Sequence, residues 1–140
     1  MHRRPLGRGR TLAAVGALVL LIGSILPWWR LGGVDGIPPI GGNAFEASGI
    51  VVFLVGAATL ALLTLPYAAG DRPVGIDRWL AYLILVVAGW LALGLRVLDF
   101  ALDEPQAIFP DRAPGLWLSV VGLIVLSRAV YDMAHEPLRR

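Results

Sequence analysis

The side chains best placed for chemistry in this sequence are two arginine–aspartate pairs near the ends of apolar segments. Arg96 lies three residues before Asp99, and Arg128 lies four residues before Asp132. Residues four apart share one face of a helix, so the second pair can form an ion pair along its own segment. Ionisable groups within an apolar span are the first candidates for a binding or transport site.

Both arginines lie close enough to the ends of their segments for the charged group to reach an interface. We interpret Arg128 as a boundary arginine that is paired with Asp132. Contact with a lipid headgroup or a partner helix is the alternative for Arg96, Arg128 and Asp132. A transport relay is disfavoured, because no carboxylate falls in the middle of an apolar segment.

Catalytic and metal chemistry have no visible basis in the sequence. It contains no cysteine, and His2 and His135 lie near the two ends of the chain. The acidic residues between about 99 and 114 lack the spacing of a calcium-binding loop. Nucleotide-binding, zinc and nucleophile motifs are also missing. We therefore expect no catalytic residue, cofactor or metal site, and a protein that is not an enzyme.

The composition favours a membrane protein. Of the 140 residues, 57% are hydrophobic and 16% are charged, whereas soluble domains carry about 25% charged residues. The apolar residues form four blocks long enough to cross a bilayer as helices. We predict an all-α integral membrane protein with four transmembrane helices in an antiparallel bundle. The predicted spans are about 11–29, 47–67, 79–98 and 115–133, within a domain of residues 11–134 that is flanked by a basic tail, 1–10, and a short tail, 135–140.

Arginine placement predicts the orientation. Eight of the twelve arginines fall in the two tails and in the loop near 68–78, and they lie beside apolar spans rather than in a nucleic-acid-binding patch. Positive residues remain cytoplasmic. Both ends of the chain are therefore expected in the cytoplasm, with the cell (inner) membrane as location. Residues near 35 and 107 should lie outside, and residues near 73 and 138 inside.

Four tryptophans mark the expected membrane boundaries. Trp28 and Trp29 end the first span, Trp117 opens the fourth span at the same outer level, and Trp79 opens the third span on the inner side. Indole rings prefer the depth of lipid headgroups, so we interpret all four as interface anchors. The glycine- and proline-rich segment that follows, about 30–46, is expected to lack regular structure.

Small residues recur at intervals of seven in every span, which keeps them on one stripe of a helix that crosses a neighbour. Small side chains let helices approach closely in lipid, so we expect these stripes to be packing seams. Val86, outside the stripe of its span, is expected to face lipid. The stripe residues are Gly16 and Gly23, Gly49 and Gly56, Ala81 and Ala88, and Gly115 and Gly122.

The two halves of the chain also resemble each other at an offset of 66. The segment "ASGIVVFLVG" (47–56) aligns with "APGLWLSVVG" (113–122), and Arg30 aligns with Arg96. Duplication of a two-helix hairpin would produce this pattern, with both copies entering the membrane from the same side. The alternative is that similar composition produces the identities by chance.

The segments "LPWW" (26–29) and "PGLWLSVVG" (114–122), with the glycine-rich loop between the first two spans, resemble small, uncharacterised four-pass membrane proteins of high-GC bacteria. This resemblance implies a fold but no activity. We expect an accessory or scaffold subunit that packs with other membrane proteins or with its own copies in the lipid. A transporter or channel subunit that works as an oligomer is one alternative, and a lipid-binding membrane protein is another.

Overall fold

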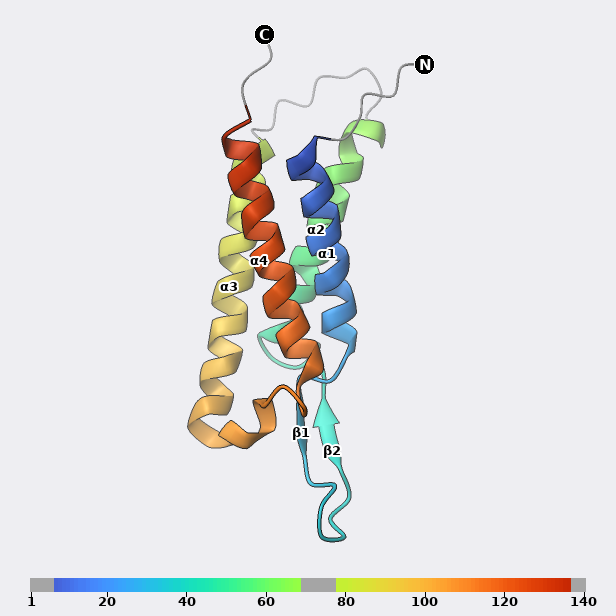
Figure 1. The fold of residues 1–140 in the computed structure, drawn as a ribbon, viewed down its shortest axis with the longest axis vertical. Coiled ribbons are helices and arrows are strands. Elements are labelled where there is room, and N and C mark those ends of the chain that lie inside the picture. Colours follow the sequence, from blue (N-terminus) through green and yellow to red (C-terminus); the bar gives the residue numbers. More distant parts are fainter. Residues whose placement is uncertain (1–6, 69–77, 137–140) are drawn as a thin grey trace.

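A computed structural model shows four long helices and one short β-hairpin (Figure 1). The structure describes residues 7–68 and 78–136, so the connection between the second and third helices and most of both tails lie outside it. All four helices are long and apolar enough to cross a membrane, which confirms the four predicted helical segments. The elements are α1 (Arg8–Ile25), β1 (Trp29–Leu31), β2 (Ile40–Gly42), α2 (Gly49–Ala68), α3 (Arg78–Asp103), η1 (Pro105–Ile108) and α4 (Pro114–Ala134).

Prolines determine where two of the helices end. α1 stops at Ile25, four residues earlier than predicted, because a proline disfavours helical geometry in the residue before it. Leu26, which precedes Pro27, has extended dihedral angles of φ −71° and ψ 158°. α3 continues to Asp103, five residues beyond its predicted end, and stops two residues before Pro105. Arg96 therefore lies about two turns inside α3 rather than near its end.

The segment after α1 is not irregular, contrary to expectation. β1 and β2 pair antiparallel, with Trp29 opposite Gly42 and Leu31 opposite Ile40. The turn between them places Gly32, Gly33 and Gly36 at φ values near +78°, a region that glycine adopts without steric cost. The hairpin projects beyond one end of the helices in Figure 1. The described fold is therefore mostly helical rather than purely helical.

α1 and α4 pack along a seam of glycines, and among the described helix pairs this one has the most extensive contact. A Cβ atom on Gly16 would lie 3.1 Å from the carbonyl oxygen of Gly122, and one on Gly23 would lie 3.0 Å from that of Gly115. Gly9 continues the stripe one heptad earlier, against the carbonyl oxygen of Ala129 at 3.2 Å. Increasing residue numbers on α1 thus meet decreasing numbers on α4. The two helices run in opposite directions.

The other predicted stripes have different surroundings. Gly56 packs against α1, where a Cβ atom would lie 3.1 Å from the carbonyl oxygen of Ala17. Gly49 instead contacts the backbone of Ala44 in the segment just before its own helix. Its spacing of seven from Gly56 therefore does not mark a helix seam.

The inward face of α3 differs from the predicted one by a single position. Its buried residues are Tyr82, Val86, Gly89, Ala92 and Leu93, and a Cβ atom on Gly89 would lie 2.6 Å from Leu123. Ala81 and Ala88 each lie one position before a buried residue, and both are only half-buried. One residue is a rotation of about 100° around a helix. The prediction that Val86 faces lipid is wrong, because its side chain is only 6% exposed.

The repeat relation of the two halves stays a prediction. α2 and α4 both begin within the aligned ten-residue segments. The aligned arginines, however, occupy different structures, since Arg30 lies in β1 and Arg96 lies inside α3. A duplication would therefore have diverged at the end of the first helix.

Candidate functional site

A polar cluster where the hairpin meets the helices is the first candidate site. Glu46, in the segment between β2 and α2, accepts a hydrogen bond of 2.8 Å from the indole Nε1 of Trp29 on β1. The same carboxylate oxygen, Oε2, lies 3.4 Å from a terminal nitrogen of Arg96 on α3. One carboxylate thus joins a strand, a loop and a helix. We call Trp29, Glu46, Arg96 and the neighbouring Phe100 the hairpin anchor.

Arg96 is held inside this cluster rather than extended towards solvent. Its side chain is 12% exposed, and its guanidinium carbon lies 4.5 Å from the centre of the Phe100 ring. That ring also lies 6.3 Å from the ring of Trp29. The partner of Arg96 is Glu46, from a distant loop, and not Asp99 on its own helix. A partly buried guanidinium over an aromatic face, with one opposing carboxylate, is a cation–π and ion-pair arrangement that fixes position.

Trp28 belongs to the protein core, so its interpretation as an interface anchor is wrong. Its indole is fully buried, and Nε1 donates a hydrogen bond of 2.9 Å to the carbonyl oxygen of Gly23. Its backbone N–H donates to the carbonyl oxygen of Gly42, at 2.8 Å. The indole therefore fills the space between the end of α1 and the hairpin, and satisfies its one donor internally.

Trp79 and Trp117 occupy half-exposed positions near the starts of helices. Trp79 is 40% exposed at the start of α3, and Trp117 is 44% exposed near the start of α4. Trp117 donates from Nε1 to the carbonyl oxygen of Ile108, at 2.9 Å, and so connects α4 to η1. Their role as interface anchors stays a prediction.

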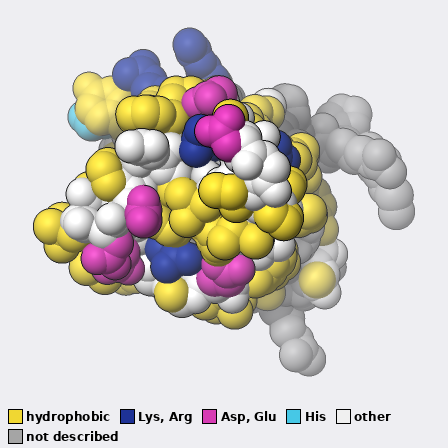
Figure 2. Space-filling model, turned by 90° about the horizontal axis from the view of Figure 1, so that it is seen from below, with side chains coloured by type: hydrophobic (Ala, Val, Ile, Leu, Met, Phe, Trp, Pro, Cys, Tyr) yellow, Lys and Arg dark blue, Asp and Glu magenta, His cyan; other side chains and the backbone are white. Residues whose placement is uncertain are grey.

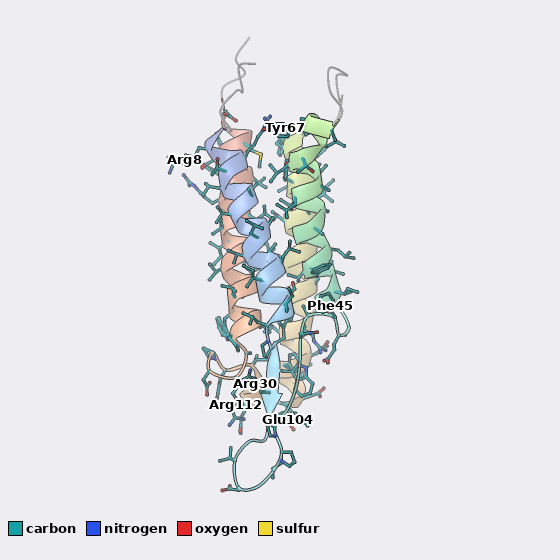
Figure 3. The ribbon with its side chains drawn as sticks, turned by 90° about the vertical axis from the view of Figure 1, so that its right-hand side faces the viewer. Arg8, Arg30, Phe45, Tyr67, Glu104 and Arg112 are labelled. Carbon is teal, nitrogen blue, oxygen red and sulfur yellow. The ribbon has the colours of Figure 1, made fainter. Side chains whose placement is uncertain are left out.

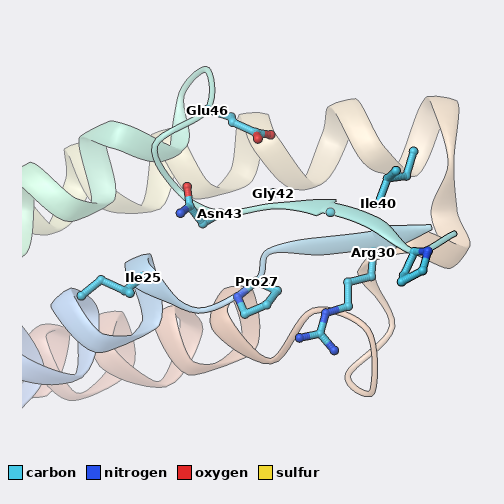
Figure 4. A pocket seen from close by; sticks show the side chains of 9 residues that line it. Ile25, Pro27, Arg30, Ile40, Gly42, Asn43 and Glu46 are labelled. Atoms are coloured by element: carbon cyan, nitrogen blue, oxygen red, sulfur yellow. The ribbon is translucent and has the colours of Figure 1, made fainter. Parts of the chain in front are cut away.

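A groove of about 430 Å³ runs beside the hairpin, between β2 and the end of α1 (Figure 4). Ile25 and Pro27 form its apolar side. Arg30 and Glu46 carry the charges, and Figure 4 shows them on either side of the two strands. Other lining residues are Pro39, Ile40, Gly41, Gly42 and Asn43.

A second ionic cluster lies at the opposite end of the bundle, where Figure 3 shows Arg8. The predicted pair is present, since Nε of Arg128 lies 3.2 Å from Oδ1 of Asp132. Arg8 on α1 is a further partner that the sequence did not indicate, with Nε 3.9 Å from Oδ2 of the same aspartate. The Asp132 side chain is 16% exposed, whereas those of Arg8 and Arg128 are 85% and 60% exposed.

The fully buried hydroxyl groups inside the helices donate to the backbones of their own helices. Ser24, Thr59 and Ser119 are fully buried, and each donates to the carbonyl oxygen four residues earlier, at 2.7–2.9 Å. Such local bonds are the usual role of hydroxyl groups within helices. Within residues 7–68 and 78–136, no three His, Cys, Asp or Glu side chains are placed to hold a metal ion.

No protein-family model, curated protein or solved structure matches this chain. The two ionic clusters and the groove are therefore interpreted from their geometry. The clusters involve Glu46 and Arg8, neither of which was expected from the sequence to bind a partner. Both residues are distant in sequence from the groups they contact, so no local spacing indicated them.

Proposed function

We propose that the protein is a multi-pass inner-membrane protein with an antiparallel bundle and both chain ends in the cytoplasm. The charges of the two bundle ends support this orientation. The hairpin end, seen in Figure 2, carries acidic and basic side chains among hydrophobic ones. It has more acids (Asp35, Glu46, Asp99, Asp103, Glu104 and Asp111) than arginines (Arg30, Arg96 and Arg112). The other end carries Arg8, Arg10 and Arg128, as expected for the cytoplasmic side.

Reporter fusions test the orientation. A reporter that works only outside the cytoplasm should be active when it is inserted near residue 35 or residue 107. A reporter that works only in the cytoplasm should be active when it is fused after residue 136. The reason is that the arginine-rich end of the bundle is retained inside. A cytoplasmic signal from the insertion near residue 35 would overturn the orientation, because that residue lies in the hairpin turn.

On the basis of this proposed membrane orientation, we infer that the chain is a non-enzymatic accessory or scaffold subunit. The observation that carries this proposal is an apolar hairpin tip on a fixed support. Val34, Ile37 and Ile40 are 57%, 63% and 58% exposed. The hairpin that presents them is held by the hairpin anchor and by buried Trp28. Fixing a structured element in advance reduces the entropy lost on binding.

The helix glycines, by contrast, support the subunit role less than their sequence pattern suggested. Gly16, Gly23, Gly115 and Gly122 are used within the chain, in the seam between α1 and α4. A partner within the membrane would therefore have to contact other surfaces of the helices. α2 and α3 offer exposed apolar side chains such as Leu54, Ile84 and Leu91. These faces suit lipid or partner helices equally, and the hairpin tip is the more specific feature.

Purification in mild detergent tests the subunit role. Wild-type protein should retain a membrane protein in a defined ratio, and Ile37→Asp should reduce that ratio at least tenfold. A charged side chain at the centre of an apolar contact is costly to desolvate. Leu102→Asp is the matched control, since Leu102 is 76% exposed at the same end of the bundle but lies outside the hairpin. It should retain the partner.

Two outcomes would contradict the proposal. If Ile37→Asp retains the partner as well as wild type does, the hairpin tip is not the docking surface. If the protein purifies as a homo-oligomer alone and carries ions or solutes across liposome membranes, it is a transporter or channel subunit instead.

A further inference from the structure

Two arginines from different helices share one aspartate at the cytoplasmic end of the proposed orientation. Asp132 lies between them, with Oδ1 facing Arg128 on its own helix and Oδ2 facing Arg8 at the start of α1. The carboxylate is mostly buried, while both arginine side chains are mostly exposed. Asp132 thus has one guanidinium group within ion-pair distance of each carboxylate oxygen, and both guanidinium groups remain open to solvent.

The orientation of the two guanidinium groups leaves their terminal amino groups available to donate hydrogen bonds. In both ion pairs the nitrogen nearest to Asp132 is Nε. The two terminal amino groups of each arginine make no ion pair with another described residue. A planar guanidinium donates two parallel hydrogen bonds to the oxygens of a phosphate or carboxylate. Two such groups side by side match an anion with several oxygens.

The surroundings of Arg128 favour a lipid as the source of that anion. Val121 and Ile124, seven and four residues earlier on α4, share its helix face and are 50% and 54% exposed. They extend from Arg128 towards the middle of the bundle. Tyr131, 54% exposed, lies on the other side, with its ring centre 5.1 Å from the guanidinium carbon. An acyl chain along the aliphatic residues would bring its headgroup to the arginines.

We propose that Arg8 and Arg128 together bind the phosphodiester group of an anionic phospholipid, positioned by Asp132. The charge balance of this end favours an anionic over a zwitterionic lipid. Its described residues include Arg8, Arg10, Arg78 and Arg128 against Asp132 and Glu136, which is a net charge of +2. Glu136 lies near the backbone of Gly7. Basic groups at a membrane surface attract anionic lipids in this way.

This inference uses the membrane insertion and orientation proposed above but not the subunit role. A failed reporter topology would overturn the orientation while leaving the binding measurement meaningful. Loss of partner binding at the hairpin would leave the lipid site unaffected, because the two sites lie at opposite ends of the bundle. The two proposals therefore fail separately.

Titration of the full chain with phosphatidylglycerol, in a zwitterionic detergent, tests the site by native mass spectrometry. Phosphatidylcholine with the same acyl chains is the reference lipid. Wild type should bind phosphatidylglycerol at least tenfold more tightly than phosphatidylcholine. Arg8→Gln and Arg128→Gln should each weaken phosphatidylglycerol binding about tenfold, the effect of losing charge-assisted hydrogen bonds.

Two further variants distinguish a site from a general charge effect. Arg10→Gln removes the same charge from the same turn of α1, yet Arg10 has no ion pair with Asp132, so this variant should bind as wild type does. Arg128→Lys keeps the charge but lacks the two terminal amino groups, and should lose most of the preference. It also carries the test if Arg128→Gln fails to fold, as judged by helical content and elution volume.

The inference is overturned if Arg128→Lys retains the full preference, because charge alone then explains binding. It is also overturned if Arg10→Gln loses as much affinity as Arg8→Gln. Inorganic phosphate, tested alone, should bind at least tenfold more weakly than phosphatidylglycerol. Equal affinity would assign the site to a free anion rather than a lipid.

Discussion

Replacing Gly115 with alanine is expected to lower the free energy of unfolding by about 3 kcal/mol or more, as overpacking at a fixed contact does. The new Cβ atom would meet the backbone of Leu26 and, at 2.6 Å, the carbonyl oxygen of Gly23. Both belong to the end of α1, where backbone atoms cannot move aside as a side chain can. The N–H of Gly115 also donates to the carbonyl oxygen of Pro27, at 2.9 Å. Any displacement of α4 would lengthen that bond.

Gly94→Ala is the matched control for this substitution. Gly94 is also a helix glycine, but a Cβ atom there would meet nothing within 4 Å. In a helix, alanine is more favourable than glycine by about 0.5–1 kcal/mol, so Gly94→Ala should be neutral or stabilising. Denaturation in mixed micelles, followed by circular dichroism, measures both. An equal free energy of unfolding for the two variants would mean that close packing between α1 and α4 does not contribute to stability.

The α1–α4 seam is also the part of the fold that the sequence predicted best. The spacing of seven between Gly16 and Gly23, and between Gly115 and Gly122, is a property of one helix, so it is visible locally. The same pattern gave a wrong prediction at Ala81 and Ala88. In an apolar segment, the face towards the protein and the opposite face differ little in side-chain hydrophobicity. A phase error of one residue then rotated the predicted inward face of α3 by about 100°.

The hairpin anchor could not be predicted for a different reason. It depends on Glu46, in a loop, meeting Arg96 at a separation of fifty residues, and no local pattern encodes that contact. The apolar residues thin out after position 98, which predicts the end of the span there and places Arg96 near that end. Trp28 and Trp29 are neighbours of identical type, but their side chains have different partners. One fills the core and the other binds Glu46.

Removal of Glu46 is the second substitution with a large expected effect. Glu46→Ala should lower the free energy of unfolding by about 2–3 kcal/mol, because Trp29 loses its acceptor and Arg96 keeps a mostly buried charge without a partner. Glu46 is itself 47% exposed, so the full cost of breaking a buried pair, about 3–5 kcal/mol, is not expected. Asp99→Asn is the control. It removes the nearest acid on α3 and should change stability by less than about 0.5 kcal/mol.

The double variant Glu46→Ala with Arg96→Met decides whether the loss comes from the stranded charge. An apolar side chain of similar length can replace a buried charge at little cost, so most of the lost stability should return, leaving a coupling energy of at least about 1 kcal/mol. Amide exchange in the hairpin gives a second reading. Even in the stable double variant, the N–H of Trp28 and the β1–β2 amides should exchange faster, because the strand has lost its contact with α3. If Glu46→Ala alone leaves both stability and exchange unchanged, the hairpin is held by Trp28 without the ionic anchor, and the fixed support proposed for partner docking must come from that buried indole.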